Sequence, residues 1–176
     1  MLQMKKCIGW RASLVSACAR SKSFVVSIMD MELPPDFKEF LRLLNANDVA
    51  YLVIGGYAVG YHGYPRATND IDIWIAINPR NAQRMVSVLR TFGFDTPELS
   101  DSLFLRQQAI VRMGLPPMRI EITTGISGVS FDECYPDRVV DTIDGVEVSF
   151  ISLHHLKANK KASGRHKDLS DLENLP

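Results

Sequence analysis

The sequence Tyr51-Leu-Val-Ile-Gly-Gly-Tyr57, followed by Arg66-Ala-Thr-Asn-Asp-Ile-Asp-Ile-Trp-Ile75, decides the fold of this chain. Most of its apolar residues are β-branched or aromatic, which is typical of strands. The first run ends at Gly55-Gly56, and the second contains Asp70 and Asp72. Because side chains i and i+2 of a strand share a face, the two acids should project together, roughly 7 Å apart at about 3.3 Å per residue.

Two carboxylates on one face of an otherwise apolar strand have no structural advantage. Like charges this close repel by about 0.2–1 kcal/mol, and acids are poor strand formers. Together, however, Asp70 and Asp72 could bind a hard divalent cation, which prefers oxygen ligands. The turn at Gly55 and Gly56 would let a phosphate approach the backbone. We interpret the pair as functional, the alternative being a strand that exposes two acids to solvent.

A third carboxylate would complete a metal site. Two later segments have an acid between β-branched residues, Ile120-Glu121-Ile122 and Val146-Glu147-Val148. Glu147 follows a hairpin turn, where an exposed acid is ordinary, so we favour Glu121 as the third ligand. Three carboxylates can bind two Mg²⁺ ions, which would neutralise a triphosphate and activate an attacking hydroxyl.

The length and charge of the chain favour one soluble domain. It has 176 residues, 46% of them hydrophobic and 23% charged, with a formal net charge of zero. The first 29 residues contain five basic side chains and no acid, so the rest carries a net charge of −5. An acidic body is not typical of a general nucleic-acid binder. The three cysteines have no zinc-site spacing, and no apolar run reaches the length of about 18 residues that spans a bilayer. We therefore expect a cytoplasmic protein without a membrane segment.

The basic, serine-containing N-terminal stretch superficially resembles a targeting peptide, but its apolar stretches are too broken for a secretory signal. We interpret residues 1–32 as a disordered arm or an over-extended start, and residues 33–176 as a single domain.

Proline, glycine and hydrophobic periodicity divide the body into short elements. We expect helices at about 35–45, 56–63, 79–92, 152–163 and 167–175, and strands at 51–54, 70–77, 108–113, 118–123, 139–143 and 146–151. Asp144-Gly145 is a strong hairpin signal. Strands and helices do not alternate strictly, which predicts an α+β fold: a small mixed β-sheet with flanking helices and a C-terminal helix pair.

Several of these residues match the pattern of a known protein family. The Gly55-Gly56 turn, then Arg66-x-Thr68-x-Asp70-Ile-Asp72, then Glu121, resemble the signature of the DNA polymerase beta-like nucleotidyltransferases. The segment Lys161-x-x-Gly-Arg165-x-Lys-Asp-Leu169 also resembles their small bacterial members, which include minimal, antibiotic-modifying and abortive-infection type IV toxin nucleotidyltransferases. The resemblance covers about residues 36–172. In one respect the chain departs from the pattern, because Glu121 stands where many members have Asp.

The resemblance implies transfer of a nucleoside monophosphate from an NTP, ATP among them, to a hydroxyl, with release of pyrophosphate. Asp70, Asp72 and Glu121 would bind two Mg²⁺ ions, Glu121 also serving as a base. Gly55 and Gly56 would offer backbone N–H groups to the phosphates. The acceptor could be a tRNA, a protein or a small molecule, and a toxin-like member could have an antitoxin partner. The alternative is a non-catalytic relative that binds a nucleotide or a partner.

Further basic and polar residues are candidates for nucleotide contacts. Arg66 would bind a phosphate and Thr68 would orient the turn, whereas the plainer interpretation is a surface arginine and a β-former. The C-terminal block is the one basic cluster of an acidic body, and in it Lys161 and Arg165 are the best candidates for a phosphate or RNA contact. A solvated helix face is the alternative.

Overall fold

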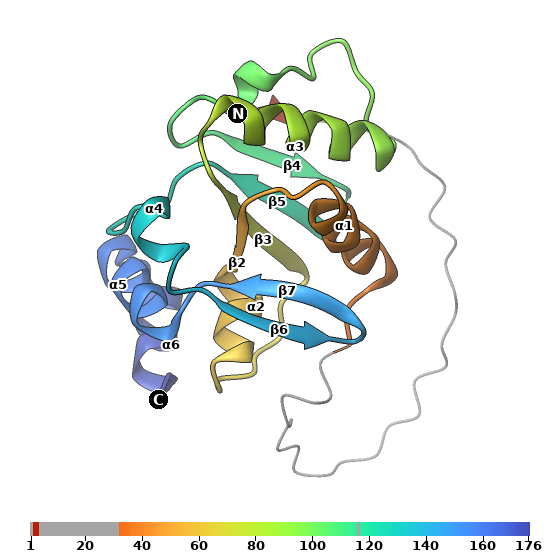
Figure 1. The fold of residues 1–176 in the computed structure, drawn as a ribbon. Helices are drawn as coiled ribbons and strands as arrows, with labels where there is room; N and C mark the ends of the chain where they lie inside the picture. Colours follow the sequence, from red (N-terminus) through yellow and green to blue (C-terminus); the bar gives the residue numbers. More distant parts are fainter. Residues whose placement is uncertain (1, 4–31, 116) are drawn as a thin grey trace.

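The centre of the molecule is a mixed sheet with strand order β1-β4-β5-β3-β2-β7-β6 (Figure 1). The computed structural model describes residues 2–3, 32–115 and 117–176. The strands are β1 (Leu2–Gln3), β2 (Tyr51–Ile54), β3 (Asp70–Ile75), β4 (Ile110–Met113), β5 (Arg119–Thr123), β6 (Val139–Ile143) and β7 (Val146–Phe150). β3 lies in the middle of this order, antiparallel to β2 and parallel to β5.

The two faces of β3 differ because its side chains alternate. Ile71, Ile73 and Ile75 point to one face and are at most 1% exposed. Asp70, Asp72 and Trp74 alternate with them and share the other face. The apolar set belongs to the main hydrophobic core, so burying it fixes which face presents the two acids.

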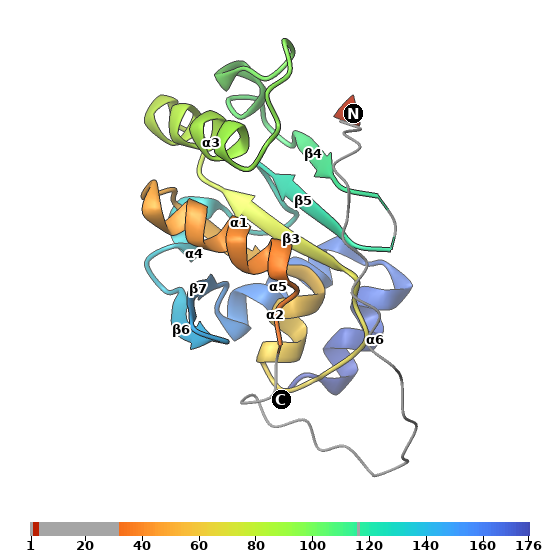
Figure 2. The same ribbon diagram turned by 90° about the vertical axis from the view of Figure 1, so that its right-hand side faces the viewer.

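Helices cover both sides of the sheet. They are α1 (Pro35–Ala46), α2 (Gly55–Tyr61), α3 (Pro79–Thr91), α4 (Phe131–Cys134), α5 (Leu153–Ser163) and α6 (His166–Asn174), with a 3₁₀ turn, η2, at Asp101–Leu103. Figure 2 shows α1 and α3 together on one side of the sheet and the pair α5–α6 on the other. None of the helices in the described part of the chain is long and apolar enough to cross a membrane.

Local signals account for the ends of several elements. The Asn78 side chain accepts a hydrogen bond of 2.8 Å from the Asn81 backbone N–H and caps α3, which begins with Pro79. Gly164, with a φ of 63°, ends α5 in the left-handed region. Asp144 and Gly145 both have positive φ and form the β6–β7 hairpin.

The expected α+β fold is confirmed: a mixed sheet, flanking helices and a C-terminal helix pair. Strand β3 ends at Ile75 rather than Ile77. Most of the proposed arm at 1–32 falls outside the described residues. Leu2–Gln3 are described, and they pair in parallel with β4.

Candidate active site

Asp70, Asp72 and Glu121 lie on neighbouring strands at one face of the sheet. In the parallel pairing of β3 and β5, Asp72 is directly opposite Glu121, and Asp70 is opposite Arg119. All three acids are half-buried. The competing candidate, Glu147, is exposed on β7, where its pairing partner is Thr142 on β6. The structure therefore places Glu121, and not Glu147, beside the Asp-x-Asp pair.

Two arginines bind two of these acids. Arg119 holds Asp70 through both oxygens, with Nε–Oδ1 at 3.1 Å and Nη2–Oδ2 at 2.7 Å. Arg112, opposite Glu121 on β4, donates from Nε to Glu121 Oε2 at 2.5 Å. Of the three acids, Asp72 alone makes no ion pair within the described part of the chain.

The unpaired carboxyl of Asp72 has a strongly shifted pKa. Burial is the largest cause, and repulsion by Glu121 and then Asp70 adds to it, so that the pKa rises to about 6. A hydrogen bond from the Gly56 backbone and the positive charge of Lys160 act in the opposite direction. The raised pKa therefore reflects burial first and the two neighbouring carboxylates second, a combination found at many functional sites.

The glycine turn packs directly against these acids. Gly55 has a φ of 62°, and a Cβ added there would lie 1.9 Å from Asp72 Oδ2. A Cβ on Gly56 would lie 2.7 Å from Thr68 Oγ1. Thr68 Oγ1 in turn donates a hydrogen bond to the Asp70 carbonyl at 3.2 Å. Only glycine fits at these two positions, and Thr68 lies between the turn and the start of β3.

The donor chemistry of this site suits Mg²⁺, because three carboxylates supply the oxygen ligands that a hard cation prefers. Repulsion between the Asp72 carboxylate and those of Glu121 and Asp70 also favours a bound cation. The three acids do not form a cluster of ligand atoms within 4.8 Å of one another. Asp70 and Glu121 are bound instead by Arg119 and Arg112, so a cation here would compete with two guanidinium groups.

Comparison with solved structures shows which fold this is. The chain is similar to TM1012 of Thermotoga maritima, a provisionally assigned nucleotidyltransferase. The match covers 78% of this chain and 88% of TM1012, with 16% identity and a TM-score of 0.52. It is also similar to the lincosamide antibiotic adenylyltransferase LnuA, which was solved with lincomycin bound. That match covers 80% of this chain and 94% of LnuA, with 14% identity and a TM-score of 0.52. The chain has the nucleotidyltransferase fold.

At this level of identity the likeness defines the fold of the chain. No protein-family model matches the sequence, and neither does any curated protein.

Arg66 is bound by the C-terminal helix rather than left open to a ligand. Its Nε and Nη2 donate to the two carboxylate oxygens of Asp171 at 2.7 and 3.1 Å. Asp171 is 1% exposed and lies on α6. The arginine therefore fastens the loop before β3 to α6, and its expected phosphate contact stays a prediction.

The structure singles out Lys160 within the basic C-terminal block. Lys161 is exposed, and the side chain of Arg165 is 83% exposed, with Asp168 at 3.9 Å. Lys160 is 3% exposed, and its Nζ contacts Asp168 and Asp171, each at 2.7 Å. Its positive charge also offsets part of the rise in the pKa of Asp72. Sequence reasoning missed this lysine because its two partners follow it by 8 and 11 positions on another helix.

Proposed function

We propose that this protein is a metal-dependent nucleotidyltransferase that moves a nucleoside monophosphate from an NTP to a hydroxyl acceptor. The observation that carries the proposal is the register of β3 and β5, which puts Glu121 directly beside Asp72. Together with Asp70, these acids form a negatively charged face next to a glycine turn in a nucleotidyltransferase fold.

Each residue has a role in this proposal. Asp70, Asp72 and Glu121 would hold Mg²⁺, two ions being expected. Bound there, the cation would neutralise the triphosphate and acidify the acceptor hydroxyl. Glu121 would accept the hydroxyl proton. The acceptor oxygen then forms a bond to the α-phosphorus as the bond to the bridging oxygen breaks, and pyrophosphate leaves.

Backbone and basic groups would orient the phosphates. Gly55 and Gly56 would offer N–H groups, with Thr68 supporting the turn. Lys161 and Arg165 are exposed and could reach a phosphate of the NTP or of an RNA acceptor. Arg66 would contribute mainly through its ion pair with Asp171.

We consider two chemical classes of acceptor. LnuA is a lincosamide antibiotic adenylyltransferase, which supports ATP as donor and a small molecule as one acceptor class for this chain. A tRNA or a protein hydroxyl, in the cytoplasm and with an antitoxin as partner, is the other class to be tested.

A labelling experiment with matched variants tests the proposal. Purified protein is incubated with Mg²⁺, each α-³²P-NTP in turn, and either total tRNA, cell lysate or a panel of lincosamides and aminoglycosides. We expect label transfer that Asp72→Ala and Glu121→Gln abolish. Glu147→Gln, which changes the acid that lies between two valines on β7, should leave transfer unchanged.

One observation favours a non-catalytic relative that binds a nucleotide or a partner. Two of the three acids are already bound by arginines, and the trio does not gather within 4.8 Å. If no NTP and acceptor give transfer, but an NTP raises the Tm of the wild type and not of Asp72→Ala, the binding role is supported instead.

A further inference from the structure

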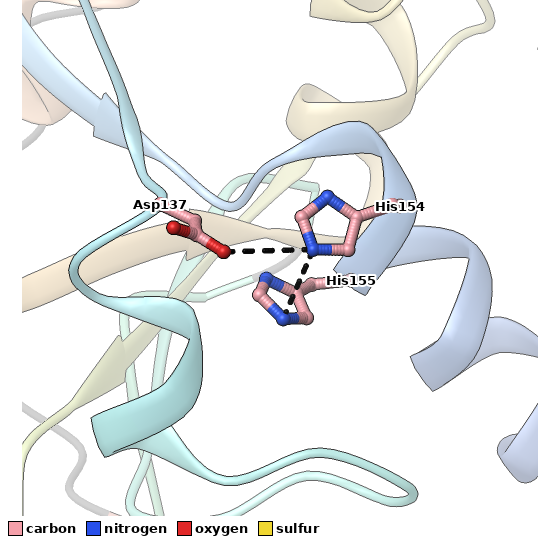
Figure 3. A group of neighbouring side chains, drawn as sticks. All are labelled: Asp137, His154 and His155. Carbon is pink, nitrogen blue, oxygen red and sulfur yellow. Dashed lines mark hydrogen bonds and ion pairs between the residues drawn. The ribbon is translucent and has the colours of Figure 1, made fainter.

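A second group of ligating side chains lies away from the three carboxylates, at the start of α5. His154 and His155 are in the first turn of that helix, and Asp137 belongs to the connection between α4 and β6 (Figure 3). One ligand atom from each lies within 4.8 Å of the others, the only such group of three His, Cys, Asp or Glu residues in the described part of the chain.

Ser152 orients both imidazoles. Its Oγ lies 3.2 Å from His154 Nδ1 and 2.9 Å from His155 Nδ1. A hydroxyl oxygen has two acceptor lone pairs and can therefore receive an N–H from each ring. In that arrangement both Nδ1 atoms are protonated, and both Nε2 atoms carry a free lone pair.

Two lone pairs facing each other in this way favour a bound cation. His154 Nε2 and His155 Nε2 are 3.1 Å apart, and neither can donate a hydrogen bond in this tautomer. Asp137 Oδ2 is 3.7 Å from His154 Nε2. Zinc–nitrogen bonds of about 2.0–2.1 Å put the ligand atoms of a tetrahedral site about 3.3 Å apart, between these two distances.

The surroundings leave room for an ion to enter. The side chains of His154 and Asp137 are 65% and 57% exposed. The nearby carboxylate of Glu133 is already engaged, since it accepts hydrogen bonds from the Ser130 hydroxyl and backbone N–H as the cap of α4. The site therefore offers three protein ligands and an open fourth coordination position.

We propose that Asp137, His154 and His155 bind a first-row transition-metal dication such as Zn²⁺, with water at the fourth position. Two imidazoles and one carboxylate suit borderline metals, whereas Mg²⁺ prefers oxygen ligands alone. The ion would join the α4–β6 connection to the start of α5, the helix that also carries Lys160. It is separate from any cation held by Asp70, Asp72 and Glu121.

Zinc titration of the full chain tests this proposal. Metal-free protein competes with a chromogenic chelator for Zn²⁺, and we expect one equivalent to bind tightly to the wild type. Ser152→Ala should weaken binding about 10- to 100-fold, because it removes the group that orients both rings. His154→Ala, His155→Ala and Asp137→Ala should weaken it at least as much.

Two controls make the result specific. His166→Ala removes an exposed histidine of α6 and should change nothing, and Asp72→Asn should also keep the affinity. Cobalt substitution should give the visible absorption of a four-coordinate site, and Zn²⁺ should raise the Tm of the wild type but not of His154→Ala. All variants are first compared in EDTA by circular dichroism to confirm folding.

Three results would overturn the proposal. The first is the absence of stoichiometric binding, which would mean that the two rings share only a proton. The second is binding that survives in the His154→Ala/His155→Ala double variant. The third is binding abolished by Asp72→Asn, which would place the ion at the sheet carboxylates.

Discussion

Gly55 lies against Asp72 so closely that a side chain at position 55 would collide with the carboxylate. The added Cβ would be 1.9 Å from Oδ2, 2.7 Å from Cγ and 3.0 Å from Cβ of Asp72, and the φ of Gly55 is 62°. The collision with Asp72 and the left-handed backbone would each destabilise a variant with a side chain at position 55, and substitutions can distinguish the two contributions.

Gly55→Ala should destabilise the fold by more than the roughly 1–2 kcal/mol of a left-handed alanine alone. Asp72→Ala in the same chain removes Oδ2 and Cγ, so the double variant should recover most of the collision cost and keep the backbone cost and the 3.0 Å contact with Cβ. Urea unfolding of the four proteins measures this coupling. Additive effects would show that the turn moves away from Asp72.

Asp72→Asn should stabilise the metal-free protein in a pH-dependent way. The pKa of Asp72 rises from 3.8 unfolded to about 6 folded, so the folded chain holds a proton longer as the pH increases. Stability then falls between about pH 4 and pH 6, and the full cost persists above that window. The variant escapes this cost and should gain about 1–2 kcal/mol at pH 8, after allowance for solvent screening, and little at pH 4.

Unfolding curves in EDTA across this pH range provide the measurement. Glu147→Gln, at an exposed acid of β7, serves as the matched control and should change stability by less than about 0.5 kcal/mol at any pH. A pH-independent gain for Asp72→Asn would contradict the raised pKa.

Lys160→Ala and Lys161→Ala should differ widely although the two positions are adjacent. Without Lys160, two acids of α6 lose a buried partner, and one of them, Asp171, is 1% exposed. Breaking such a buried pair costs about 3–5 kcal/mol, whereas an exposed lysine is worth less than about 0.5 kcal/mol. Comparison of the urea midpoints decides this, and equal effects would refute the buried network.

Arg119→Gln should strengthen divalent-cation binding at the carboxylate site. Arg119 occupies both oxygens of Asp70, so its removal frees that carboxylate and leaves more negative charge beside Asp72. The readout is the rise in Tm with Mg²⁺ concentration, which should reach half its maximum at a lower concentration than in the wild type. Arg90→Gln, which breaks the exposed pair with Asp95, should not shift it. An unchanged Mg²⁺ dependence for Arg119→Gln would argue against metal binding at Asp70.

Features that depend on local sequence could be predicted. The apolar run of Tyr51–Ile54 and the Asp144-Gly145 turn gave the correct elements, because burial and backbone preference are encoded within a few residues. The proximity of Glu121 to Asp72 followed from the acid–apolar alternation of two strands, once both were assumed to pair.

Contacts between distant residues could not be predicted in this way. The Arg66–Asp171 pair spans 105 positions, and nothing near Arg66 identifies its partner. The arginines that bind Asp70 and Glu121 could be located only once the strand register was known. The cluster at Asp137, His154 and His155 was missed because its ligands come from two elements and lack a recognised spacing.

The parallel pairing of β3 and β5 also limits which insertions the chain can tolerate. Side chains alternate with a period of two, so one extra residue between Arg119 and Glu121 would turn the acid toward the core and Ile122 toward the solvent face. Two extra residues would restore the face but shift Glu121 by two positions along the strand, so that it would lie opposite Trp74 instead of Asp72. Lengthening the β4–β5 connection at Gly114 and Leu115 would preserve both. Length variation should therefore be tolerated in the β4–β5 connection and excluded between Arg119 and Glu121.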